Sequence, residues 1–189
     1  FEPGRKIFKV GERAFFLYFI IKGVIILGKH SYQGKRQILK FLGPGEILGE
    51  KTVFDQKTYT AFAEVHENAK VIELERRSLL EILKRNPQFS LRIIEKLSQE
   101  IKGYQAKLTE TSYENTEQRL ARFLLRVAGK FGKKREPGLY IGMEFSWDNL
   151  AEAIGISPET VSRKLGEFEK KELIRKENGR IYISGLIPI

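Results

Sequence analysis

The chain has 189 residues, of which 41% are hydrophobic, and its formal net charge is +10. No run is long and apolar enough to cross a membrane, so we expect a soluble protein, and since no secretion signal is visible a cytoplasmic address is the default expectation. The absence of cysteine excludes a disulfide, a thiolate zinc site and a cysteine-ligated iron–sulfur cluster within these residues. The sequence begins at Phe1 and not at a methionine, so what precedes this residue cannot be read from it.

Residues 1–86 are predicted to form a β-rich domain. The β-forming runs FFLYFII (15–21) and VIILGKH (24–30) are separated by glycine, and similar runs follow at 61–65 and 70–74. Successive short strands with turn signals predict an antiparallel roll or barrel. The pattern becomes helical over 77–85, and Asn86-Pro87 is expected to end that helix.

A longer helix is predicted from Gln88 to about Thr111. Its apolar residues fall on a stripe with coiled-coil spacing, which favours a two-stranded coiled coil between two copies of the chain. The stripe consists of Leu91, Ile94, Ile101 and Leu108, supported by Leu97 and Tyr104. The alternative is that this helix lies on the β-rich domain as part of its core. The polar residues 112–116 are predicted to be a hinge.

Residues 117–189 are predicted to form a winged helix-turn-helix. An amphipathic helix is expected over 117–130 and β-forming sequence over 138–145, before two short helices that hinge at Gly155. The apolar stripe of these two helices is Leu150, Ala151, Ile154, Ile156, Val161 and Leu165. Two strand-like runs then meet at Asn178-Gly179, a dipeptide that favours a tight hairpin. A hairpin after the second short helix supplies the wing.

The second short helix is predicted to read DNA bases. Ser157 is expected to cap it and Pro158 suits its first position, so its exposed face is well defined. Arginine can donate two hydrogen bonds to guanine, glutamate can accept one from cytosine, and a hydroxyl can contact a base or a phosphate. The DNA-binding candidates are Ser157, Glu159, Thr160, Ser162, Arg163, Lys164 and Arg180, with Arg175 and Lys176 as further phosphate contacts. The alternative is a plain helical hairpin with a solvated charged face, against which the wing argues.

The order of β-roll, long helix and winged helix-turn-helix resembles the CRP/FNR family of bacterial transcription regulators. The resemblance covers essentially the whole chain, and it is carried by LYFIIKG (17–23), FLGPGEILGE (41–50), NTEQRLARFLL (115–125) and GISPETVSRKL (155–165). It implies a homodimer that binds a small effector in the β-roll and repositions two recognition helices on promoter DNA. Activation through RNA polymerase is the family's commoner mode, but the residues do not distinguish activation from repression.

The resemblance also implies a fold and its domains. The predicted class is α+β, with an antiparallel β-roll of jelly-roll type, like a cyclic-nucleotide-binding domain, over 1–86. A dimerisation helix is expected over 87–111, a hinge over 112–116 and the winged helix-turn-helix over 117–189.

Base-reading positions follow from the same resemblance. The family's positions fall on Glu159, Ser162 and Arg163, and this arrangement is similar to the FNR branch. We therefore expect a palindromic site with half-sites resembling TTGA, in which Arg163 reads guanine and Glu159 reads a cytosine.

The resemblance places the effector pocket at Gly49, Glu50, Tyr59, Thr60, Tyr104 and Gln105. Cyclic-nucleotide binders of the family hold the phosphate with an arginine where this chain has Tyr59. A tyrosine cannot neutralise a buried phosphate, so cyclic AMP is not expected to bind by the usual scheme. A non-standard phosphate contact from Lys51 or Lys57 is the alternative. Otherwise an unidentified effector, or none, controls the protein.

Other functions are weighed against the same residues. Haem is a remote option, because only His30 and His66 are available as histidine ligands and a lone histidine is more often an ordinary surface residue. A metal enzyme built on a β-roll needs clustered ligands, whereas Glu50 and Asp55 offer only a carboxylate pair, so we expect no metal and no catalysis. A cyclic-nucleotide-binding subunit without a DNA role is disfavoured by the winged helix-turn-helix.

Overall fold

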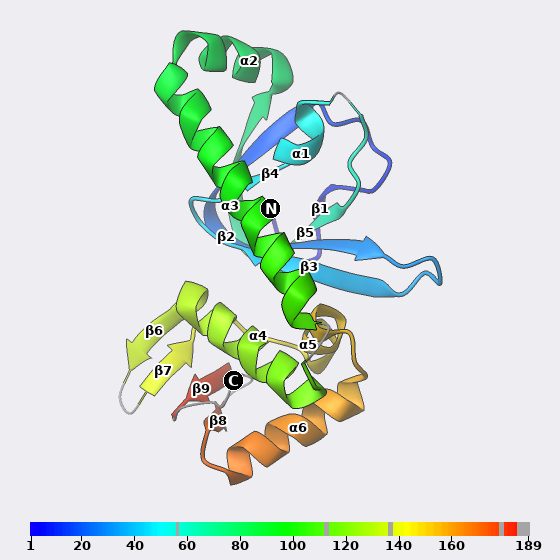
Figure 1. Ribbon diagram of the computed structural model, residues 1–189, viewed down its shortest axis with the longest axis vertical. Coiled ribbons are helices and arrows are strands. Elements are labelled where there is room, and N and C mark those ends of the chain that lie inside the picture. Colours follow the sequence, from blue (N-terminus) through cyan, green and yellow to red (C-terminus); the bar gives the residue numbers. More distant parts are fainter. Residues whose placement is uncertain (56, 112–113, 136–137, 178–179, 185–189) are drawn as a thin grey trace. The chain divides into compact units, whose positions relative to one another are not determined.

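The computed structural model describes the chain except for residues 56, 112–113, 136–137, 178–179 and 185–189. For residues 106–111, 134–135 and 138 it describes the backbone alone. The chain divides into two compact units, one made of residues 1–27 with 42–113 and the other of 28–41 with 114–189. Each unit is described by itself (Figure 1).

The N-terminal β-sheet, most of which belongs to the first unit, has the order β1-β5-β2-β3, with β4 paired to β2. Its strands are β1 (Lys6–Phe8), β2 (Phe16–His30), β3 (Arg36–Leu42), β4 (Ile47–Leu48) and β5 (Phe62–Glu75). β1 lies antiparallel to β5, and β4 lies antiparallel to β2. Side chains of β2, among them Leu17, Ile20 and Ile25, are almost wholly buried and form part of the core. The α+β class and the antiparallel β-rich N-terminal part are as predicted.

Two predicted strand breaks are wrong. The runs 15–21 and 24–30 form one strand, β2, and the runs 61–65 and 70–74 form another, β5. Gly23 does not end the strand, because its backbone takes a left-handed φ of 87° while the chain continues. A Cβ on Gly23 would lie 2.2 Å from the carbonyl oxygen of Asn68. The glycine therefore serves a close approach of two backbones, not a turn.

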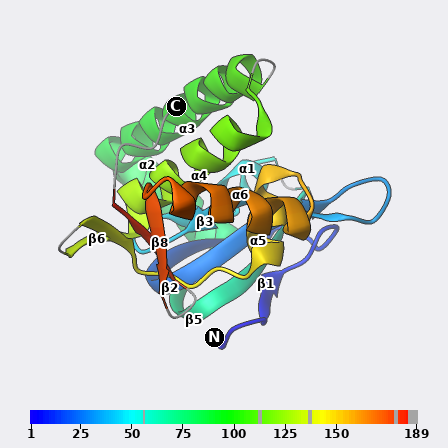
Figure 2. The same ribbon diagram turned by 90° about the horizontal axis from the view of Figure 1, so that it is seen from below.

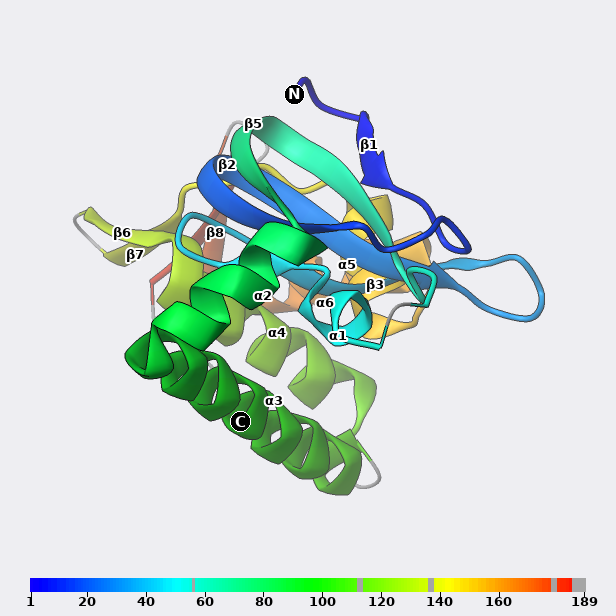
Figure 3. The ribbon, with the colours of Figure 1, turned by 90° about the horizontal axis from the view of Figure 1, so that it is seen from above.

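Three helices complete this unit, namely α1 (Glu50–Val53), α2 (Arg76–Arg85) and α3 (Pro87–Thr111). Leu79 of α2 is fully buried against Leu17 and Val53. Asn86 ends α2 as expected, but Pro87 then opens α3, a position where its missing N–H costs nothing. Figure 3 shows α2 leading into the long α3.

Most of the described apolar stripe of α3 is left exposed by the first unit. Its members Leu91, Ile94 and Ile101 are each more than half exposed, and Tyr104 is 41% exposed. Ile93, on another face, is a side chain that α3 does bury. The side chain of Leu108 lies outside the described residues.

The second unit combines three helices with a four-stranded sheet of order β6-β7-β9-β8. The helices are α4 (Thr116–Phe131), α5 (Trp147–Ile154) and α6 (Pro158–Lys170), and the strands are β6 (Gly132–Arg135), β7 (Gly138–Ile141), β8 (Ile174–Glu177) and β9 (Arg180–Ile183). β8 and β9 pair antiparallel, with Glu177 opposite Arg180, so they form the expected wing. The predicted turn at Asn178-Gly179 lies outside the described residues.

Two details of this unit differ from the prediction. The β-forming sequence 138–145 is a strand only as far as Ile141, and β6 was not predicted at all. The sequence GKKR of β6 has no apolar alternation, so only its pairing with β7 defines it as a strand.

We predict that Gly23→Ala lowers the free energy of unfolding by about 2–5 kcal/mol, because it adds a backbone clash to an unfavourable φ. Gly34→Ala is the matched control: Gly34 has a φ of 76° but open space around its Cβ position. It should cost only about 1–2 kcal/mol, the φ penalty alone. Urea denaturation of the two variants measures the difference, and equal losses would contradict the close approach.

Candidate nucleic-acid interface and ligand pocket

The helix-turn-helix is fixed locally by caps. Ser146 accepts a hydrogen bond from the backbone N–H of Asn149 at 3.0 Å and so starts α5. Gly155 ends α5 with a left-handed φ of 78°. Ser157 then accepts a hydrogen bond from the N–H of Thr160 at 3.3 Å, and Pro158 follows in the first turn of α6. The predicted turn at Gly155, the cap at Ser157 and the first-turn proline are thus confirmed.

The rotation of α6 about its own axis is set by its buried side chains. Val161, Leu165 and Phe168 are all 0% exposed, and they form the stripe that faces the rest of the unit. Figure 2 shows α6 with α5 at one end and β8 at the other. Because this stripe is buried, the opposite face of α6 is exposed, and it carries polar residues. Ser162 and Arg163 are exposed there, and Glu159 is exposed in the first turn.

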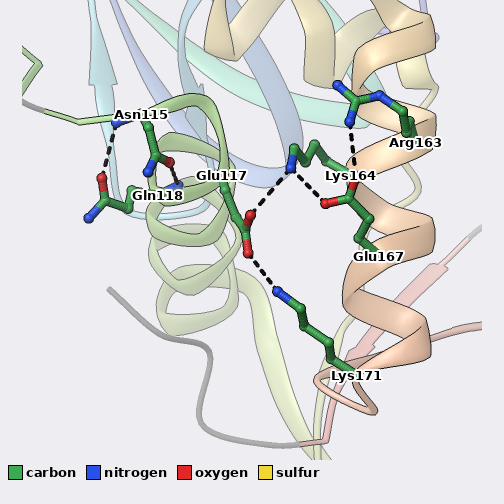
Figure 4. Close-up of polar contacts among 7 residues, drawn as sticks. All are labelled: Asn115, Glu117, Gln118, Arg163, Lys164, Glu167 and Lys171. Carbon is green, nitrogen blue, oxygen red and sulfur yellow. Dashed lines mark hydrogen bonds and ion pairs between the residues drawn. The ribbon is translucent and has the colours of Figure 1, made fainter.

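An ion-pair network runs from α4 to α6 (Figure 4). Glu117 of α4 pairs with Lys171 at 3.0 Å through one carboxylate oxygen and with Lys164 at 3.3 Å through the other. Lys164 also pairs with Glu167 at 2.6 Å, and Glu167 pairs with Arg163 at 2.9 Å. The network therefore reaches from the first turn of α4 to the exposed arginine of α6.

The start of α4 is fixed by a capping box (Figure 4). The Asn115 side chain accepts from the backbone N–H of Gln118, and the Gln118 side chain accepts from the backbone N–H of Asn115, both at 3.0 Å. Such reciprocal bonds satisfy two backbone donors at a helix start. They place Glu117 in the first turn, where it meets the two lysines. Thr116, predicted as part of the hinge, is the first residue of α4.

Hydrogen bonds to three glutamates of this region stabilise their ionised forms. The pKa of Glu117 is lowered by hydrogen bonds from Lys171 and Lys164, and the pKa of Glu167 is lowered by a hydrogen bond from Lys164. The pKa of Glu159 is lowered by a backbone hydrogen bond at the helix start and by the hydroxyl of Ser157. An ionised glutamate only accepts hydrogen bonds, as reading the amino group of cytosine requires.

Three other DNA-binding candidates are partly buried or bound by neighbouring side chains. Thr160 is half-buried, with its hydroxyl 3.1 Å from that of Ser157. Lys164 has a side chain that is 18% exposed and is held by two carboxylates. On the wing, Arg180 donates to the hydroxyl of Tyr140 and pairs with Glu144 at 3.4 Å.

The two further phosphate candidates on the wing are paired as well. Lys176 pairs with Glu169 at 2.8 Å, and Arg175 pairs with Glu177 at 3.4 Å. Contacts of all these residues with DNA stay predictions.

Sequence reasoning missed the carboxylates Glu117 and Glu167. The pair Arg163–Glu167 has the i, i+4 spacing of helical ion pairs, so the sequence carried a signal for it. Glu117 and Lys171 are 54 positions apart, and only the fold brings them together.

The expected ligand pocket of the first unit brings Gly49 and Tyr59 together. Tyr59 is 4% exposed and stacks on Phe8 with ring centroids 3.9 Å apart. Its hydroxyl donates to the carbonyl oxygen of Phe16 at 2.8 Å. A Cβ built on Gly49 would lie 3.3 Å from the ring of Tyr59. The tyrosine is thus a packed and hydrogen-bonded core residue, and burial raises its pKa, which keeps it neutral.

The remaining pocket candidates divide between the interior and the surface. Glu50 is 7% exposed, and burial raises the pKa of its carboxyl. Thr60 and Gln105 are exposed. Tyr104 accepts a hydrogen bond from the ammonium of Lys51 at 2.5 Å, and Lys51 also pairs with Glu100 at 3.2 Å.

Among the described residues, no group of three histidine or carboxylate side chains is arranged to hold a metal ion. No helix of the described chain is long and apolar enough to span a membrane.

Comparison with known proteins matches both parts of the chain. A family model for a cyclic nucleotide-binding domain matches residues 1–86, and one for a Crp-like helix-turn-helix domain matches residues 118–186. The CRP-like cAMP-activated global transcriptional regulator of Mycobacterium tuberculosis is 26% identical over 97% of this chain and 82% of the relative. The fumarate and nitrate reduction regulatory protein of Vibrio cholerae is 28% identical over 92% of this chain and 69% of the relative.

Solved structures match the fold along almost the whole chain. A CRP-family transcriptional regulator from Thermus thermophilus superimposes with a TM-score of 0.80 at 24% identity, covering 98% of this chain and 91% of the other. FixK2 from Bradyrhizobium japonicum superimposes with a TM-score of 0.85 at 20% identity, covering 98% and 90%.

Proposed function

Because the chain belongs to the CRP/FNR family of DNA-binding transcription regulators, we propose that it binds palindromic promoter sites as a homodimer. Each half-site resembles TTGA. Each recognition helix α6 enters a major groove, and a two-fold protein reads two half-sites one helical turn apart. We infer no catalytic role for the protein.

The observation that carries this proposal is the outward face of α6. Arg163 has a side chain that is 62% exposed, and Ser162 beside it is exposed as well. A guanidinium donates to both acceptors of guanine, and a carboxylate such as that of Glu159 accepts from the amino group of cytosine. Because the buried stripe prevents α6 from turning, these side chains are presented to the groove without rearrangement of the helix.

The exposed stripe of α3 supports the homodimer. Leu91, Ile94 and Ile101 recur at coiled-coil spacing on a face that the first unit leaves more than half exposed. Burying apolar area in a second copy of the same helix is favourable at about 25 cal/mol per Å². A parallel pair of α3 helices is two-fold symmetric, as a palindromic site requires.

The packing of Tyr59 supports control by an effector other than cyclic AMP, or by none. The ring of Tyr59 lies on Phe8 inside the β-roll, where the family's cyclic-nucleotide binders have an arginine. Replacing that cation by a buried neutral phenol leaves the cyclic phosphate without a counter-charge. The alternative cation Lys51 is already paired with Glu100 and bonded to Tyr104, which does not favour a non-standard phosphate contact.

Selection from a random duplex library tests the proposal directly. We expect enrichment of a two-fold symmetric site with two copies of a TTGA-like half-site. In competition binding, Arg163→Ala should lower affinity for the selected site by about 1–3 kcal/mol and relax one base position. Lys170→Ala removes a charge from the last turn of the same helix. It should lower the affinities for selected and for random DNA by one common factor. A loss in Arg163→Ala that is equal on both DNAs would show that this residue reads no base.

Ile94→Lys should convert the dimer to a monomer, because it places a charge on each side of the α3 interface. Analytical ultracentrifugation measures the change. Ile72→Lys is the matched control, since Ile72 is a similarly exposed isoleucine, at 53%, on β5 of the same unit. The control variant should remain dimeric. A dimeric Ile94→Lys protein would contradict the proposed interface.

Cyclic AMP should change neither the melting temperature nor the DNA affinity of the protein. A ligand present at about a hundred times its dissociation constant would stabilise the folded state by about 2.7 kcal/mol, which a melting curve detects readily. The cAMP-activated relative from Mycobacterium tuberculosis, measured in parallel, is the positive control. A saturable rise in melting temperature for this chain would overturn the interpretation of Tyr59.

A further inference from the structure

The recognition helix carries its own carboxylate beside the arginine that is proposed to read guanine. Glu167 lies one turn after Arg163 and pairs with it at 2.9 Å, although the Arg163 side chain is 62% exposed (Figure 4). A carboxylate on a DNA-facing helix opposes the phosphate backbone electrostatically. Its position next to Arg163 therefore needs an explanation.

The position of Glu167 is anchored from both sides. Its second carboxylate oxygen bonds the ammonium of Lys164 at 2.6 Å, and Lys164 is in turn held by Glu117 of α4 at 3.3 Å. The Lys164 side chain is only 18% exposed, so this link is shielded from solvent more than the outer pair is. Screening acts less on such shielded pairs than on exposed ones. Glu167 thus stays beside Arg163 when the exposed Arg163–Glu167 pair opens.

We propose that Glu167 is a specificity-determining residue for DNA. Its carboxylate cancels the charge of Arg163 until a guanine replaces the carboxylate as the hydrogen-bond acceptor of Arg163. This inference rests on the proposed function of α6. On random DNA the affinity comes from cations that displace counterions from phosphates, and an Arg163 held by Glu167 contributes little to that sum. At the correct site guanine offers two acceptors in fixed geometry, so Arg163 leaves the carboxylate for the base. Glu167 therefore weakens random binding more than specific binding.

The test compares wild-type protein and Glu167→Gln on the selected site and on random duplex across a salt series. Glutamine keeps the shape of the side chain and removes its charge. We expect the variant to bind random DNA about 3–10 times more tightly and the selected site less than about threefold more tightly, so that the specificity ratio falls. The slope of log K against log salt on random DNA should steepen by up to about 0.9, the value for one further phosphate contact.

A double-mutant cycle with Arg163→Ala separates the proposal from a general effect of charge. Without Arg163, the change Glu167→Gln should raise the affinities for both DNAs by one common factor and leave the specificity ratio unchanged. Glu81→Gln is the matched control, because Glu81 is also a carboxylate paired to a lysine on its own helix, with Lys84 at 3.3 Å. It should leave the ratio at the wild-type value.

Two results would overturn the proposal. One is an unchanged specificity ratio in Glu167→Gln. The other is that Glu167→Gln lowers the specificity ratio by the same factor in the Arg163→Ala protein as in the wild-type protein. Failure of the proposed function is visible earlier and separately, because wild-type protein would then enrich no sequence and Glu167 would have no specificity to determine.

Discussion

Burial of one stripe of α6 is the constraint on which the DNA-reading surface depends. Val161, Leu165 and Phe168 are fully buried, and turning the helix would expose all three at a cost of several kcal/mol. The same stripe holds Arg163 outward, and the cap at Ser157 fixes where the helix begins. The orientation of the side chains that are proposed to read bases is thus determined by apolar packing, together with that one cap.

The charged side chains of this surface pair mainly with one another. Lys164 and Lys171 neutralise Glu117 of α4, and Glu167 offsets Arg163. A reader of DNA sequence has to limit its affinity for the excess of random sites, so cancelled charge on the recognition helix is consistent with a high specificity ratio. In the β-roll the neutral ring of Tyr59 stacks on Phe8 at the position where we propose that an anion-binding cation is lacking.

The elements that sequence reasoning predicted correctly are those with local signals. Ser157, Pro158 and Gly155 mark the helix-turn-helix by capping and turn chemistry that acts over a few residues. Gly23 was misread, since its left-handed φ serves an approach to the distant Asn68, and β6 lacks any apolar alternation. At the predicted effector pocket the resemblance implied a tyrosine where the family's cyclic-nucleotide binders have an arginine, but only the fold showed its ring stacked on Phe8. The role of Glu117 likewise depends on a lysine far away in the sequence.

The contact between Arg163 and a guanine is the central claim, and replacing single guanines of the selected site by 7-deazaguanine tests it most directly. This change removes the N7 acceptor of one base and leaves its pairing and the phosphates intact. At one guanine of each half-site we expect about a tenfold loss of affinity for wild-type protein, within the range for a bidentate contact, and no loss for Arg163→Ala. An equal loss in both proteins, or no loss at any guanine, would contradict the account.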